Sequence, residues 1–124
     1  MMEIGEAAQA FGALAHETRL RVFKLLIEAA PDGVPATEIA NQVGVRQNLM
    51  SSHLSTLVSA GLATNRRDGR RVYYSVDLER VKKLLAFLIE DCCQDSPQAC
   101  QALVDVVSTL AAKKVAKQKE AALA

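Results

Sequence analysis

Residues 47–62, QNLMSSHLSTLVSAGL, restrict the fold more than any other stretch, because they show two unlike faces at helical spacing. One face is apolar and predicts packing on a core. Its members are Leu49, Met50, Leu54, Leu57 and Val58. The other face is small, polar and almost uncharged. Its members are Asn48, Ser51, Ser52, Ser55 and Ser59. A solvated helix face usually carries Lys and Glu pairs, whereas Ser and Asn suit close approach to hydrogen-bonding groups such as those of a DNA groove. A Ser-rich surface helix is the alternative interpretation of this stretch alone.

The flanking residues favour a DNA-binding motif. Residues 37–43, TEIANQV, predict a short helix that ends at Gly44, so this helix and the next form a helix-turn-helix. Downstream, the pair Asp68-Gly69 stands between two extended runs and predicts a tight hairpin. Apolar residues alternate with polar ones through residues 71–76, as expected of a half-buried strand. A helix-turn-helix followed by such a hairpin is a winged helix.

Positive charge is concentrated around this hairpin, although the whole chain has a net charge of only +1. Residues 41–76 contain five arginines and a single acidic residue, Asp68. Four of these arginines flank the turn: Arg66, Arg67, Arg70 and Arg71. Like charges this close repel one another, so an anionic partner is favoured over a simple solvated hairpin. A local basic zone in a neutral chain is typical of a domain that contacts phosphate with one surface.

The remaining helical segments predict a dimer. Residues 3–15 carry an apolar stripe that must pack on the domain or on a partner chain, and residues 78 to about 92 carry a broad apolar band. Ser96-Pro97 predicts the start of a last helix. We therefore expect a mainly α fold with a small β-hairpin, a winged helix-turn-helix that dimerises through helices at residues 3–15 and 78–112. Residues 1–112 are expected to form this single domain, and residues 113–124 a charged, frayed tail.

Neither a signal peptide nor a membrane span is expected from the sequence. The first residues lack a basic segment followed by an apolar one, and the apolar runs are short. The expectation is a cytoplasmic protein without a membrane partner.

Three segments together carry a family resemblance: ALAHETRLRVFKLL, QNLMSSHLSTLVSAGLA and RDGRRVYYSVD. In their order and spacing the chain resembles the ArsR/SmtB family of bacterial winged-helix repressors, over roughly residues 5 to 93. The resemblance implies a homodimer that binds a palindromic double-stranded DNA operator and leaves it when a metal or metalloid binds; it implies a regulator, not an enzyme. By position it implies major-groove contacts from Gln47, Asn48, Ser51, Ser52 and Ser55. It also implies phosphate or minor-groove contacts from Arg66, Arg67, Arg70 and Arg71.

The two histidines are interpreted as structural residues. His53 lies on the inward side of the 47–62 helix, so we expect it to be hydrogen-bonded rather than to read DNA. His16 occupies a position where the family often has an acidic helix cap, and this departure puts the cap in doubt.

The three cysteines, Cys92, Cys93 and Cys100, lie in one short segment, DCCQDSPQAC. The resemblance offers two sensor sites, and this sequence lacks both. An arsenic site of the family has several Cys in the helix before the reading helix, but residues 37–43 contain no Cys. A zinc site of the family uses His, Asp and Glu on the helix after the wing, but the helix that begins at Leu78 has no His. Three thiolates without a nearby His suit a soft, thiophilic ion, whereas structural zinc prefers four ligands. The segment also resembles C-terminal arsenite sites of some family members. We therefore expect arsenite or antimonite as the inducer, bound by Cys92, Cys93 and Cys100, and no organic cofactor.

Three alternatives for the cysteines stay open. They could be small core residues at a dimer interface, since free Cys is commonly buried. They could form a reversible disulfide, which would make the switch an oxidation. A thiol enzyme that processes arsenic species is the third alternative, but it needs a cationic neighbour or a general base, and the segment supplies Asp and Gln instead.

Overall fold

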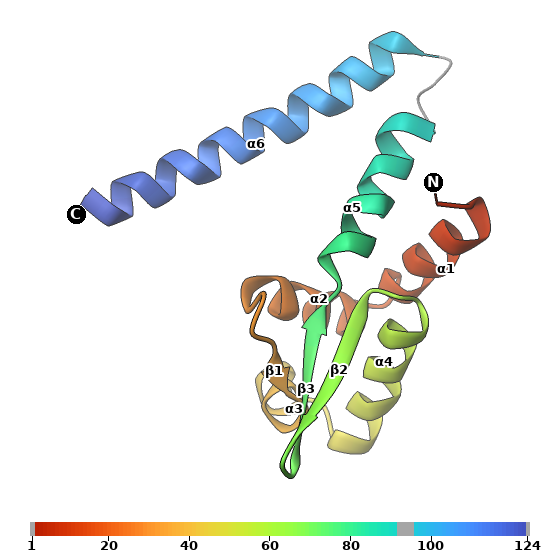
Figure 1. The fold of residues 1–124 in the computed structure, drawn as a ribbon, viewed down its shortest axis with the longest axis vertical. Helices are drawn as coiled ribbons and strands as arrows, with labels where there is room; N and C mark the ends of the chain where they lie inside the picture. Colours follow the sequence, from red (N-terminus) through yellow and green to blue (C-terminus); the bar gives the residue numbers. More distant parts are fainter. Residues whose placement is uncertain (1, 92–95, 124) are drawn as a thin grey trace. The chain divides into compact units, whose positions relative to one another are not determined.

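The computed structural model describes residues 2–91 and 96–123. The chain divides into two compact units, Met1–Leu84 and Leu85–Ala124. In chain order the first unit contains α1 (Ile4–Leu14), α2 (Glu17–Glu28), β1 (Val34–Pro35), α3 (Ala36–Val43), α4 (Gln47–Ser59), β2 (Ala63–Asp68), β3 (Arg71–Val76) and most of α5 (Leu78–Ala86) (Figure 1). The second contains the end of α5, the π-helical turn η1 (Phe87–Asp91) and α6 (Pro97–Leu123).

The core of the first unit lies where α1 to α4 meet. It is aliphatic, and its fully buried large side chains are Val22, Leu26, Ile39, Met50, Leu54, Leu57 and Leu62. Helix α1 packs on this core through small residues, Ala7, Ala10 and Ala13, whereas Ile4 is 78% exposed and Phe11 also faces outward. The large residues of the predicted stripe therefore stay available for a partner chain.

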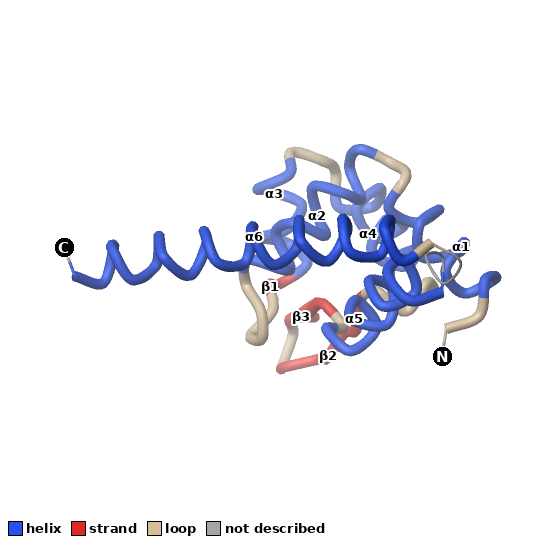
Figure 2. Tube along the Cα trace, turned by 90° about the horizontal axis from the view of Figure 1, so that it is seen from above, coloured by secondary structure: helices blue, strands red, loops and turns tan. Residues whose placement is uncertain are grey.

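A three-stranded antiparallel sheet of order β1-β3-β2 completes the first unit, and α2, α3 and α4 lie along one side of it (Figure 2). The predicted hairpin is confirmed: Asp68 pairs with Arg71 across a turn of Gly69 and Arg70, and Gly69 has φ 64°. Strand β1 was not predicted, because two residues are too short to show an alternation.

In the second unit, α6 begins at Pro97 as predicted, and Ser96 caps it: the Ser96 Oγ accepts a hydrogen bond from the backbone N–H of Ala99 at 3.3 Å. Helix α6 has 27 residues and continues through Leu123, so it includes nearly all of the segment expected to be a tail. The boundary between domain and tail at residue 112 stays a prediction. Among the described residues, no helix is long and apolar enough to cross a membrane.

Candidate nucleic-acid interface

Helix α4 is held by its apolar face and presents its polar face outward. Met50, Leu54 and Leu57 are buried, and α3 before it ends at Gly44, as predicted. The five residues expected to read bases are all exposed on α4: Gln47, Asn48, Ser51, Ser52 and Ser55. The structure therefore brings the predicted reading residues onto one accessible helix.

The prediction that Leu49 belongs to the buried face of α4 is wrong. Leu49 is 55% exposed, although the periodicity assigned it to the buried face. The buried face of α4 is centred on Met50, Leu54 and Leu57. Leu49 lies at the edge of this face, and the next residue along the same edge, His53, is only half-buried. At the first turn this edge row is open, so Leu49 adds an apolar side chain beside the polar reading face.

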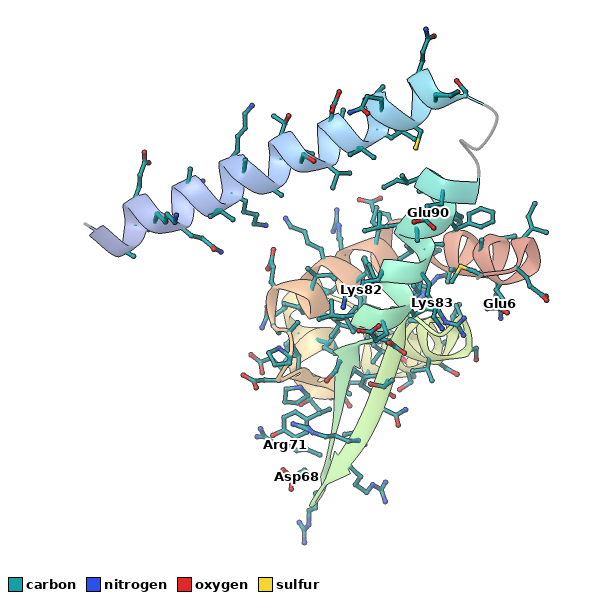
Figure 3. All side chains as sticks on the ribbon, turned by 45° about the horizontal axis from the view of Figure 1, so that its top comes forward. Glu6, Asp68, Arg71, Lys82, Lys83 and Glu90 are labelled. Carbon is teal, nitrogen blue, oxygen red and sulfur yellow. The ribbon has the colours of Figure 1, made fainter. Side chains whose placement is uncertain are left out.

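The β2–β3 hairpin projects from the helices, with Asp68 and Arg71 near its end (Figure 3). All four of its arginines are exposed. The strand register divides them, since residues directly opposite in an antiparallel pair point to the same face of the sheet. Arg66 and Tyr73 share one face with Asp68 and Arg71, while Arg67 lies on the other face.

Arg66 differs from the other three arginines because it is tied to the sheet. Its guanidinium lies 4.5 Å from the centroid of the Tyr73 ring, and its Nη2 donates a hydrogen bond to the carbonyl oxygen of Asp32 at 3.3 Å. A cation over an aromatic face is attracted to the ring. Arg66 is thus placed to stiffen the hairpin, which the charge pattern of the sequence could not reveal.

Two hollows flank the start of α3, one on the side of the hairpin and one on the side of the reading helix. The larger has a volume of about 180 Å³ and is lined by Pro35, Ala36, Thr37, Arg70, Arg71 and Val72. The smaller has about 70 Å³ and is lined by Ala36, Thr37, Gln47, Met50, Ser51 and Leu54. Two guanidinium groups beside the first turn of a helix attract phosphate, because the helix N-terminus carries partial positive charge.

The middle and the C-terminal end of α4 are tied to other helices by Arg19 and Arg80, which the sequence pattern did not single out. On its inner side, His53 lies near Arg19 of α2, which supports the predicted hydrogen-bonded role of that histidine. Beyond its C-terminal end, the Arg80 guanidinium of α5 lies next to Gly61 and forms an ion pair with Glu6 of α1 at 2.7 Å. Helices α1, α2 and α5 therefore all contact the reading helix or its end.

The structure describes only one of the three predicted thiol ligands. Cys92 and Cys93 lie outside the described residues. Cys100 is half-buried in the first turns of α6, and its Sγ lies 3.5 Å from the carbonyl oxygen of Ile89 in η1. Within the described residues, no group of three His, Cys, Asp or Glu side chains could hold a metal ion. Cys100 thus lies beside the turn that directly precedes Cys92 in the sequence.

Comparison with known proteins places this geometry among transcriptional regulators. A family described as a helix-turn-helix domain matches residues 14–66. An uncharacterised HTH-type transcriptional regulator of Mycobacterium tuberculosis is 34% identical over 79 residues, which cover 64% of this chain and 68% of the relative. A homologue of the cadmium resistance regulatory protein CadC from Staphylococcus aureus is 34% identical over 85 residues, covering 67% and 69%.

A solved structure agrees with these relatives. It is the homodimeric winged helix-turn-helix DNA-binding domain of a possible ArsR-family regulator from Mycobacterium bovis, with a TM-score of 0.58 and 30% identity. The match covers 77% of this chain and 85% of the other.

Proposed function

The chain belongs to the ArsR family of winged-helix transcriptional regulators, and on that premise we propose that it is a homodimeric repressor of a palindromic DNA operator. As a regulator of this family it is not an enzyme. The proposal is carried by one observation: the exposed, uncharged face of α4 stands beside a hairpin with four exposed arginines. Uncharged hydrogen-bonding side chains read bases, and arginines neutralise phosphates.

The interface divides into readers and phosphate contacts. Gln47, Asn48, Ser51, Ser52 and Ser55 enter the major groove from α4. Arg67, Arg70 and Arg71 contact the backbone or the minor groove, and Arg66 holds the hairpin in shape through Tyr73 while its charge adds to the local potential. The hollow between Arg70, Arg71 and the start of α3 is where we place a DNA phosphate.

Exposed apolar residues support a homodimer. In the first unit Ile4 and Phe11 of α1 are exposed, and in the second α6 exposes Leu103, Val104, Val107 and Leu110. The α6 residues recur at helical spacing, and an apolar helix face left exposed on a small protein marks an interaction site. Two-fold pairing of two chains would present two reading helices to two DNA half-sites, which lie about 34 Å apart when one DNA turn separates them.

For the inducer we propose trivalent arsenic or antimony, bound by Cys92, Cys93 and Cys100. Three Cys thiols would displace three hydroxide groups from arsenous acid, form three As–S bonds and release three water molecules. The position of Cys100 beside η1 supports this arrangement, because η1 directly precedes the other two thiols in the sequence. The cadmium resistance regulator among the relatives is named for another thiophilic ion.

The test begins by selecting a binding duplex from a randomised pool with the purified full chain. Size-exclusion chromatography with light scattering then gives the oligomeric state, and fluorescence anisotropy gives the affinity for the selected duplex. A monomer, or a chain that selects no duplex, would refute the repressor proposal. Arsenite or antimonite should release the duplex, with arsenate as the control because it lacks affinity for three thiols.

Variants of the thiols distinguish the inducers. Cys92→Ser, Cys93→Ser and Cys100→Ser should each keep DNA binding and lose the response to arsenite. If all three variants respond like the wild type, the thiol site is wrong. Release by peroxide without metalloid, with a Cys–Cys disulfide detected by mass spectrometry, would instead establish the oxidation switch.

A further inference from the structure

The two histidines of the chain meet behind the reading helix. His16 precedes α2 as its N-cap residue, and His53 is half-buried on α4. Their ring centroids are 4.7 Å apart, and the ring planes are tilted by 49°. The contact therefore joins the start of α2 directly to the middle of α4.

Both rings use Nδ1 as an acceptor. The backbone N–H of Thr18 donates to His16 Nδ1 at 3.2 Å, which caps α2 in place of the usual acidic residue. Arg19 Nη1 lies 3.4 Å from His53 Nδ1. A guanidinium can only donate, so His53 Nδ1 must accept and cannot carry a proton. Protonation of either Nδ1 would abolish its hydrogen bond.

Arg19 extends this contact to a third helix. Its Nε donates to the carbonyl oxygen of Ala13 at the end of α1, at 2.6 Å. Among the described residues, the charges that act on His53 are those of His16 and Arg19 from the start of α2, while α1 contributes the uncharged Ala13 carbonyl. A proton on His53 would thus lie against a guanidinium, and like charges at this distance repel.

We propose that His16, Arg19 and His53 form a proton-sensitive clamp that holds α4 against α1 and α2, so that protonation of His53 weakens operator binding. The clamp rests on the proposed DNA-binding function for its effect on the operator, but not for its existence. None of these three residues is one of the predicted DNA contacts, so they act on binding through the position of α4. Burial lowers the pKa of His53 from its usual value of about 6.5, and His16 and Arg19 lower it further.

Two measurements without DNA test whether the clamp exists. Nitrogen NMR of the wild-type rings should show His53 neutral at pH 7.5, with Nδ1 unprotonated; the signals are simple because the chain has two histidines. Urea unfolding should show stability falling as the pH drops below about 6.5, because the unfolded chain then binds a proton that folded His53 still refuses. A protonated Nδ1 on His53 at pH 7.5 would overturn the clamp, as would a constant stability in this range.

The effect on DNA is measured as the ratio of affinities at pH 7.5 and pH 5.5 for the same duplex. In the wild type the affinity should fall about tenfold, within the usual range of coupling between sites. His53→Gln keeps an acceptor for Arg19 without titrating, and His16→Asn keeps a helix cap but removes the ring that lies against His53. Each should reduce the ratio, and the double variant should abolish most of it.

The double variant also serves as the control for every other effect of pH on protein and DNA. If its affinity ratio equals that of the wild type, the histidines do not control binding and the proposal is wrong. If the variants fail to fold, the tautomer and stability measurements on the wild type still decide whether the clamp exists. A chain that binds no duplex would refute the repressor function, and the clamp would then stand or fall by those two measurements.

Discussion

Replacing Gly61 with alanine tests how α5 is joined to the end of the reading helix. Gly61 follows α4 with φ 80°, a conformation that costs an L-residue with a side chain about 1–2 kcal/mol. A Cβ atom built on Gly61 would lie 2.5 Å from Arg80 Nε and 2.8 Å from Arg80 Nη2. The guanidinium would have to move, and its ion pair with Glu6 would be disturbed.

Gly69 supplies the matched control for the backbone part of this cost. It has φ 64° in the hairpin turn, and a Cβ there would meet no atom within 4 Å among the described residues. Alanine also lowers the conformational entropy of the unfolded chain, which stabilises the fold by about 0.4–1 kcal/mol. Gly69→Ala should therefore lower the free energy of unfolding by about 1 kcal/mol net. The Arg80 and Glu6 side chains are 32% and 48% exposed, so solvent limits their pair to about 0.5 kcal/mol. With the lost packing on Arg80, Gly61→Ala should cost about 2 kcal/mol.

The assay is urea unfolding at pH 7.5, in the wild type and in an Arg80→Ala background. Removing Arg80 clears the space beside Gly61, so Gly61→Ala should then cost no more than Gly69→Ala. This double-mutant comparison isolates the contact from the backbone strain. Equal costs for the two glycine variants in the wild type would refute the reasoning, and so would an excess that persists without Arg80.

Three further variants test the core and the two parts of the interface. Leu54→Ala removes a fully buried side chain from α4 and should lower the free energy of unfolding by about 2–5 kcal/mol, measured in urea. Arg70→Ala should weaken binding to all duplexes and reduce the slope of log affinity against log salt by about 1, while Lys82→Ala, exposed on α5, should leave the slope unchanged. Ser51→Ala should change the preferred operator sequence in a duplex selection, and Ser108→Ala on α6 should not; the same effect from both would contradict the assignment of α4 as reader.

Local patterns in the sequence were sufficient to predict the winged helix. The turn chemistry of Asp68-Gly69 and the end of α3 at Gly44 depend on a few adjacent residues, so they can be recognised without the fold. The same holds for the alternation of β3, whose Tyr74 and Val76 pair with Asn65 and Ala63. Such features follow from backbone stereochemistry and hydrophobic periodicity alone.

The contacts around α4 could not be predicted in this way. Arg19 and Arg80 look like ordinary charged residues of amphipathic helices, and only the packing of α2 on α4 and of α5 on α1 gives them partners far away in the sequence, His53 and Glu6. Likewise, the four arginines of the hairpin are equivalent in a charge count, and the strand register alone separates Arg66 from Arg67. Contacts between different helices and strands therefore determine the role of each of these arginines, and neither hydrophobic periodicity nor a charge count can predict such contacts.

The register of β2 and β3 also limits how the hairpin can change in length. Side chains alternate between the two faces of a strand, so one residue inserted in β3 would invert every residue beyond it. Tyr73 would leave the face of Arg66, and Val72 would exchange sides with Arg71. Within the paired part of β2 and β3, insertions must therefore come two residues at a time if Arg66 is to stay over Tyr73.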